Sequence, residues 1–65
     1  MKIQYFRDTD TLYIEFNGRH IVETRELDEN TVLDLDGEGR VCALTLEHAS
    51  VRADLPHVTM EGLAP

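Results

Sequence analysis

Three acidic side chains and a glycine are spaced in this chain as in the first half of a calcium-binding loop. Asp34, Asp36, Glu38 and Gly39 give the pattern D-x-D-x-E-G. An EF-hand loop also needs a bidentate glutamate at its twelfth position and a helix on each side. The chain has Thr45 at that position and its flanking residues alternate as in strands, so the pattern predicts a hairpin turn and no metal site.

Cys42 is the single cysteine of the sequence and a candidate nucleophile. Its spacing places it on one side of a predicted strand together with Leu44 and Leu46. A cysteine in such a position behaves as a small apolar residue with an unreactive thiol. We therefore expect Cys42 to pack in the core. A lone cysteine also excludes a disulfide within the chain and a thiolate zinc cluster.

Histidines and paired aspartates are the remaining candidates for acid–base or metal chemistry. The three histidines, His20, His48 and His57, lie on different predicted elements without an i, i+4 pair, which indicates neither a zinc site nor a catalytic dyad. Asp8 and Asp10 share one loop, where turn formation and capping of backbone amides are the simpler account. We predict no catalytic residue and hence no enzyme.

A glycine-containing acidic segment, residues 36–39, has the wrong context for a phosphate-binding loop. It links two predicted strands, whereas such a loop follows a strand and opens a helix, and its acids would repel phosphate. No nucleotide cofactor is therefore expected, and no other cofactor is indicated.

The chain is strongly acidic, with 13 acidic and 6 basic residues and a net charge of −7. This balance argues against direct binding to nucleic acid, which requires neutralisation of phosphates. Seven of the acids lie between Glu23 and Glu38, where Arg25 is the one base. Such a segment is typical of a solvated surface, and a partner that bound it would be basic. The candidate partner-binding residues are Glu23, Glu26, Asp34, Asp36 and Glu38.

The chain is short for a self-sufficient domain. At 65 residues, folding buries about 60% of the surface of the extended chain. The hydrophobic gain of about 100 kcal/mol then roughly equals the conformational entropy that folding costs. Because a disulfide and a thiolate zinc site are excluded, we expect a second subunit to stabilise the fold, in a homodimer or larger homo-oligomer.

No segment is expected to interact with a membrane. The longest apolar run is far below the about 18 residues of a membrane span. The N-terminus carries charges at Lys2 and Arg7 and lacks the apolar region of a signal peptide. A cytoplasmic protein is therefore predicted.

Hydrophobic residues recur with a period of two through most of the chain, which predicts strands. A first strand covers about 2–6. A second carries Leu12, Ile14 and Phe16 on one side and ends at the turn-forming pair Asn17-Gly18. Residues 20–27 alternate more weakly, which indicates an exposed or edge strand.

The next two strands form a predicted hairpin, 31–36 with 41–47, whose register has two alternatives. A two-residue turn at Glu38-Gly39 pairs Leu35 with Cys42, Leu33 with Leu44 and Thr31 with Leu46. A three-residue turn, 37–39, shifts the pairing by one residue. We favour the first because it collects the apolar side chains on one face.

The predicted fold is therefore mainly β, a small antiparallel meander of about five strands. A short C-terminal helix within 48–54 would end before Pro56. The domain spans 1–52, and 53–65 forms a tail or short extension. The exposed edges and faces of so small a sheet also favour pairing with a second copy.

The turns and buried positions of this chain resemble those of DUF2283, a small and mostly prokaryotic family of unknown function. The resemblance covers about residues 2–52. The family commonly has Val-Gly where this chain has Cys42-Ala43. This difference questions any role that depends on a backbone left uncovered by a side chain at that position. The matching positions are Tyr5, Asp8, Asp10, Leu12-Tyr13-Ile14, Leu33-Asp34-Leu35-Asp36, Gly39-Arg40-Val41, Leu44, Leu46, Ala49 and Ser50.

The family likeness implies a small β-rich protein and transfers no catalytic residue. Some relatives look as though they are paired with small basic toxin-like proteins, which implies that an acidic member could serve as an antitoxin. Two functions follow as hypotheses. The first is a self-associating interaction module, antitoxin-like in its concrete form. The alternative is a small-ligand or cation-binding protein with its site between subunits, using Asp34, Asp36, Glu38 or a histidine.

Overall fold

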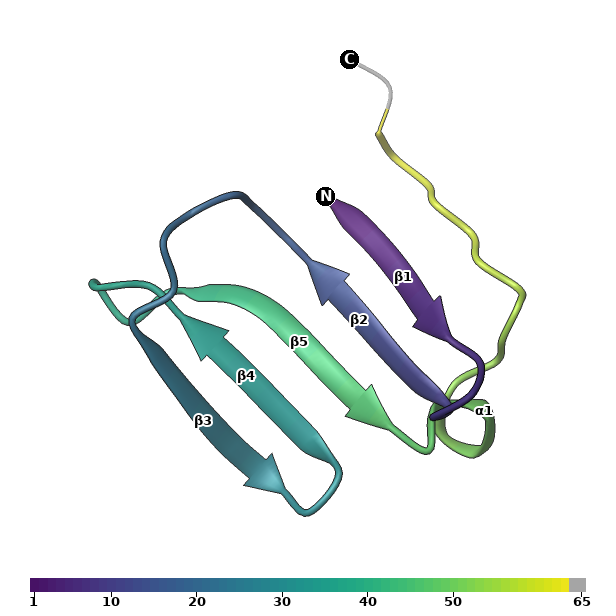
Figure 1. Cartoon of the computed structure of the whole chain (residues 1–65). Coiled ribbons are helices and arrows are strands. Elements are labelled where there is room, and N and C mark those ends of the chain that lie inside the picture. Colours follow the sequence, from purple (N-terminus) through teal and green to yellow (C-terminus); the bar gives the residue numbers. More distant parts are fainter. Residues whose placement is uncertain (64–65) are drawn as a thin grey trace.

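The computed structural model describes residues 1–63 and consists of one antiparallel sheet and one short helix (Figure 1). This confirms the predicted fold class and the resemblance-based expectation of a β-rich protein. The elements are β1 (Lys2–Phe6), β2 (Thr11–Glu15), β3 (Glu23–Asp28), β4 (Thr31–Leu35), β5 (Val41–Glu47) and α1 (Ala49–Arg52).

The strands lie in the order β1-β2-β5-β4-β3, so the last strand occupies the centre of the sheet. Strands β3, β4 and β5 form a meander, and β1 and β2 form a hairpin that joins it through β5. The predicted fold is a single meander of about five strands, and the observed order differs from it because β5 inserts between β2 and β4. Strands β2 and β3 are therefore not neighbours. The connection between them, residues 16–22, passes the ends of β5 and β4 to reach the far edge (Figure 1).

This crossing explains why β3 begins at Glu23 and not near His20, where the alternation begins. Residues 20–22 belong to the connection, and the β3–β4 pairing begins where the Val22 amide donates to the carbonyl of Leu35 at 2.8 Å. The prediction of an edge strand is confirmed, because β3 forms one border of the sheet and all six of its residues are exposed.

The register gives the sheet two unlike faces, because residues directly opposite each other project to the same side. One row aligns Ile3, Ile14, Leu44, Leu33 and Arg25, and the next aligns Tyr5, Leu12, Leu46, Thr31 and Asp28. We call this side the apolar face. The other side, the polar face, carries in its rows Gln4, Tyr13, Thr45, Val32 and Glu26, and Lys2, Glu15, Ala43, Asp34 and Thr24.

The β4–β5 hairpin combines features of both predicted registers. Leu33 pairs with Leu44 and Thr31 with Leu46, as in the favoured register, but Leu35 pairs with Val41, so the predicted pairing with Cys42 is wrong. The turn is the three-residue one, with Gly39 at φ 80°. A β-bulge between the 34–43 and 35–41 pairs absorbs the extra residue. The apolar residues thus stay on one face despite the longer turn.

Few large side chains are buried within residues 1–63. The buried apolar residues are Leu12, Leu35, Cys42, Ala43 and Ala49. Cys42 is 1% exposed, which confirms its predicted place in the core. The accessible surface of 5033 Å² exceeds the about 4200 Å² expected of a folded monomer of this mass. A single sheet therefore leaves much of its apolar surface in contact with solvent.

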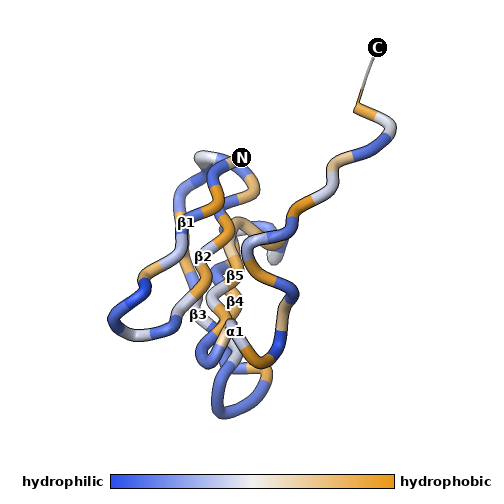
Figure 2. The backbone as a smooth tube through the Cα atoms, turned by 90° about the vertical axis from the view of Figure 1, so that its right-hand side faces the viewer, coloured by the Kyte–Doolittle hydropathy of each residue, from blue (hydrophilic) through white to orange (hydrophobic). Residues whose placement is uncertain are grey.

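The chain leaves the sheet through α1 and then runs without regular secondary structure through residues 53–63. We call this segment the arm. Figure 2 shows α1 and the arm on one side of the sheet, with the far end of the arm standing away from it. The helix confirms the predicted short C-terminal helix, whereas the domain boundary after residue 52 stays a prediction. Ala64 and Pro65, the end of the predicted tail, lie outside the described residues.

No helix among residues 1–63 is long and apolar enough to cross a membrane.

Candidate functional site

The apolar face is a candidate interaction surface of the described chain. Ile3 is 46% exposed and Tyr5 41% exposed, whereas Leu12 is 7% exposed. Ile14, Leu33 and Leu44 are half-buried, although they lie in the interior strands of the sheet. The exposed row thus runs from the β1 edge to β4. Contiguous exposed apolar side chains of this kind mark sites of protein association.

At one end of the apolar face a carboxylate joins the β1–β2 turn to α1. Asp10 closes the turn with φ 52°, and its carboxylate accepts hydrogen bonds from the Tyr5 hydroxyl at 2.6 Å and from the Ser50 hydroxyl at 2.7 Å. The Ser50 amide also donates to it at 3.0 Å, and the Ala49 amide donates to the Asp10 carbonyl at 2.9 Å. We call Tyr5, Asp10 and Ser50 the corner cluster.

These hydrogen bonds shift the titration of the groups that make them. The hydroxyls of Tyr5 and Ser50 stabilise the charged carboxylate, which lowers the pKa of Asp10 below its ordinary value of 3.8. The same bond to Asp10 raises the pKa of Tyr5 above 10.0, because it favours the protonated phenol. The corner cluster therefore holds a proton on Tyr5 and a charge on Asp10, an arrangement that fastens two elements together.

Sequence reasoning assigned Asp8 and Asp10 to turn formation and missed this longer-range role. Asp10 does end the turn, since its amide donates to the Arg7 carbonyl at 3.3 Å. Its carboxylate, however, binds Ser50, which is 40 positions away in the chain. The family likeness was the sequence signal that could have indicated this role. Its matching positions include four residues that meet at this corner, namely Tyr5, Asp10, Ala49 and Ser50.

Arg52 holds α1 from the other side. Its guanidinium donates to the carbonyl of Asn30 at 2.6 Å, to that of Glu47 at 3.1 Å and to the Thr31 hydroxyl. Thr31 belongs to the apolar face, so these bonds tie α1 to the end of that face. The remaining rows are left uncovered by the helix.

Among the predicted partner-binding residues, Asp36 is committed to the fold of the hairpin. Its side chain is 7% exposed. The carboxylate accepts from the amides of Glu38 and Arg40, each at 2.9 Å, and from Arg40 Nε at 3.1 Å. The Arg40 amide is the largest cause of a lowered pKa at Asp36. Asp36 is thus an organiser of the turn and is not free to contact a partner.

The other acids predicted to bind a partner are more accessible. Glu23 and Glu26 are exposed on the β3 edge, and Glu38 is exposed at the hairpin turn. Glu23 accepts from Arg25 at 2.8 Å and Glu38 from Arg40 at 2.9 Å. Asp34 is half-buried and accepts from the Thr24 hydroxyl at 2.9 Å. These four residues lie along the β3 and β4 side of the sheet.

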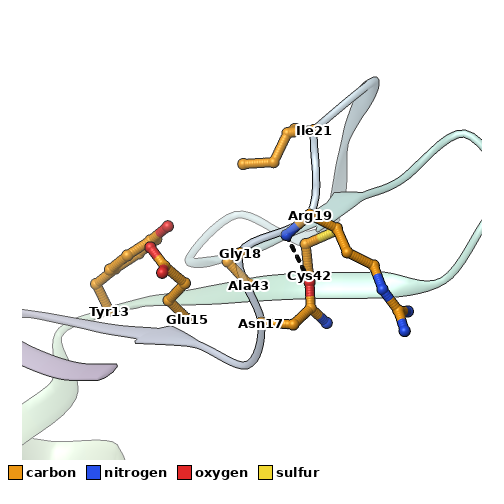
Figure 3. Close-up of a pocket in the computed structure, with 8 residues that line it drawn as sticks. All are labelled: Tyr13, Glu15, Asn17, Gly18, Arg19, Ile21, Cys42 and Ala43. Carbon is orange, nitrogen blue, oxygen red and sulfur yellow. Dashed lines mark hydrogen bonds between the residues drawn. The ribbon is translucent and has the colours of Figure 1, made fainter. Parts of the chain in front are cut away.

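Two shallow hollows lie on the surface of the described chain. One, of about 160 Å³, lies between the 17–21 connection and polar-face residues (Figure 3). Its lining includes Tyr13, Glu15, Cys42 and Ala43, so the connection covers the polar face at this end. Burial, followed by the charge of Glu15, raises the pKa of Tyr13. The other hollow, of about 340 Å³, is lined by Tyr5, Arg7, Ser50, Leu55 and Pro56.

The described residues, 1–63, contain no group of three or more histidine, cysteine or acidic side chains that could hold a metal ion. His57 lies 3.2 Å from Asp54 on the exposed arm, and His48 precedes α1 with φ 55°. The structure brings these histidines together neither with each other nor with Cys42.

Comparison with known proteins finds a matching family of unknown function. The model of the family described as "Protein of unknown function (DUF2283)" matches residues 2–50, from the first residue of β1 into α1. The match includes all five strands and the corner cluster, and the arm lies outside it. No curated protein and no solved structure matches the chain. Because the matched residues make up most of the chain, this protein belongs to the DUF2283 family of proteins of unknown function.

Proposed function

We propose that this protein is a non-enzymatic interaction module that self-associates through its apolar face. The observation that carries the proposal is an open sheet whose apolar face has no second layer among the described elements. Ile14, Leu33 and Leu44 are half-buried in interior strands, where a protein of sufficient size would bury them fully. A second copy placed on this face would supply the missing layer.

The sheet offers one face for such a pairing. It is five strands wide, about 20 Å at the usual strand spacing, and its strands of five to seven residues are about 17 to 24 Å long. The side chains that a second copy would cover are those of the apolar rows on β1, β2, β5 and β4.

Edge-to-edge association is less favoured at the β3 border. Glu23, Arg25 and Glu26 are exposed there, and a register shift interrupts the pairing with β4 between Glu26 and Asp28. Charged side chains and bulges are the usual features that prevent an edge strand from pairing with another chain. Self-association through the face is therefore better supported than pairing through the β3 edge.

Two substitutions on neighbouring residues of β1 test the proposal. Ile3 and Gln4 are both exposed, but they project to opposite faces of the sheet. We expect Ile3→Lys to raise the dimer dissociation constant at least about tenfold, because it places a charge in the apolar interface. Gln4→Lys adds the same charge outside it and should leave the constant within about threefold of the parent.

Sedimentation velocity from nanomolar to high micromolar concentration measures both constants. A parent protein that stays a folded monomer throughout this range would contradict self-association. Equal effects of the two substitutions would contradict the choice of face, since both residues lie on the same strand.

We further propose that the protein partner of this module is basic. Glu23, Glu26 and Glu38 are exposed on one side of a molecule with a net charge of −7. Charge complementarity of this kind accelerates association and selects the partner. The family likeness gives the proposal its concrete form, an antitoxin that covers a small basic protein which degrades nucleic acid. Asp36 is left out of the proposed surface because the turn uses its carboxylate.

Capture of partners from the native cell at low and high salt tests the basic-partner proposal. The expected result is a basic protein that is released as salt rises, and that the double variant Glu23→Lys, Glu26→Lys no longer captures. The matched control is Asp8→Lys, Glu61→Lys, which makes the same charge change away from β3. Capture that is indifferent to salt and to the β3 variant would count against this surface.

A further inference from the structure

We infer that the arm, residues 53–63, crosses to a second copy and lies on that copy's apolar face. This inference rests on the proposed self-association, and it names the segment of the second copy that contacts the face. The arm lies outside the residues matched by the family model.

The arm begins on the side of the sheet that carries the apolar face. Arg52, the residue before it, donates to the Thr31 hydroxyl, which belongs to the apolar face. Leu55 and Pro56 line a hollow together with Tyr5, which belongs to the same face. Figure 2 shows the later part of the arm standing away from its own sheet on this side. A second sheet that faced this one would meet it.

The side chains of the arm are suited to burial but are not buried within the chain. Val58 is 60% exposed, Met60 53% and Leu63 70%. The backbone hydrogen bonds of the arm join near neighbours, as from the Leu55 amide to Ala53 and from the His57 amide to Asp54. No hydrogen bond among the described residues joins 57–63 to the sheet. The arm therefore presents several apolar side chains without a partner in its own copy.

The arm is long enough to cover the exposed row. Seven extended residues, 57–63, span about 23 Å. The row from Ile3 to Leu33 crosses four neighbouring strands, which is about 14 Å at the usual strand spacing. The row is half-buried or exposed along its whole length, so an arm from a second copy has a continuous apolar surface to follow.

Paired substitutions in the arm test the inference in the full-length protein. Val58 and Met60 flank Thr59, and all three are exposed. We expect Val58→Asp together with Met60→Asp to raise the dimer dissociation constant at least about tenfold, because two apolar contacts are lost. Thr59→Asp should change it less than about threefold. Neither change touches the sheet, so circular dichroism should report an unchanged fold for both.

Nuclear Overhauser effects in a mixture of isotope-labelled and unlabelled protein identify which copy the arm contacts. The expected signals join the Met60 methyl of one copy to methyl groups of Ile14, Leu33 or Leu44 in the other. Signals confined to one copy would mean that the arm folds back on its own sheet, and would overturn the inference. A dimer that Ile3→Lys dissociates but the arm variants do not would also overturn it, while leaving the proposed self-association intact. A parent protein that is monomeric would contradict both the crossing of the arm and the proposed self-association.

Discussion

At the scale of single residues, two aspartates organise this small sheet through bonds to backbone and hydroxyl groups. Asp10 fastens the β1–β2 turn to α1, and Asp36 folds the β4–β5 turn around its own carboxylate. A third, Asp28, accepts from the Asn30 amide at 2.8 Å in the β3–β4 turn, which is the first cause of its lowered pKa. Each of the three hairpin turns thus has a carboxylate that is most favourable when charged.

The lowered pKa values of these aspartates predict a loss of stability in acid. The ordinary value is 3.8, and the folded protein holds all three below it. The unfolded chain therefore takes up protons first as the pH falls, and acidification favours unfolding. The stabilisation is complete above the unfolded value. It decreases as the pH falls below about 4 and is lost once the folded carboxylates are protonated too.

Urea unfolding at fixed protein concentration between about pH 7 and about pH 3 measures this dependence. Asp36→Asn should lower the free energy of unfolding at neutral pH and flatten its fall in acid. Asp8→Asn, at an exposed position of the β1–β2 turn, should leave the profile of the parent unchanged. A profile of Asp36→Asn as steep as that of the parent would contradict the role of this carboxylate.

At the scale of elements, the β4–β5 hairpin shows how a turn and a bulge together preserve a face. The three-residue turn by itself would move every apolar side chain of β5 to the other side of the sheet. The bulge beside Cys42 compensates for that shift, so Leu44 still pairs with Leu33. The turn depends on Gly39, whose positive φ of 80° is unfavourable for residues with a Cβ.

A pair of glycine substitutions tests this account of the hairpin. Gly39→Ala should lower the free energy of unfolding by about 1–2 kcal/mol, because alanine at positive φ is strained. Gly18→Ala is the matched control, since a Cβ at Gly18 has no atom within 4 Å and no positive φ to oppose it. Its effect should stay within about 0.5 kcal/mol. Chemical denaturation measures both, and similar effects at the two glycines would be inconsistent with a strained turn.

At the scale of the whole molecule, the proposed self-association of the open sheet makes the stability of the fold depend on protein concentration. A layer that is completed by a second copy is stabilised by mass action, whereas a self-sufficient monomer is not. The excess of accessible surface and the scarcity of large buried side chains among residues 1–63 favour the first case.

We therefore expect Tm to rise by about 3–6 °C for each tenfold increase in protein concentration. Differential scanning fluorimetry or calorimetry over two decades of concentration measures the shift. Ile3→Lys should remove the concentration dependence and Gln4→Lys should keep it. A Tm that does not change with concentration in the parent protein would show that the sheet needs no second copy.

The sequence by itself determined the strands, because alternation of apolar and polar residues is a local property that each segment carries alone. Residues 2–6 and 41–47 were predicted with the bounds that the structure has. The weak alternation before Leu27 correctly indicated an edge strand, and the spacing of Cys42 correctly placed it in the core.

Only the tertiary structure decided which strands are neighbours and where the bulge lies. Pairing depends on contacts between residues far apart in the chain, and no local pattern records that β5 inserts between β2 and β4. The same limit hid the corner cluster, since the bond from Ser50 to Asp10 exists only when the sheet brings α1 beside the first turn. Local periodicity thus determined the elements, and long-range packing determined their order.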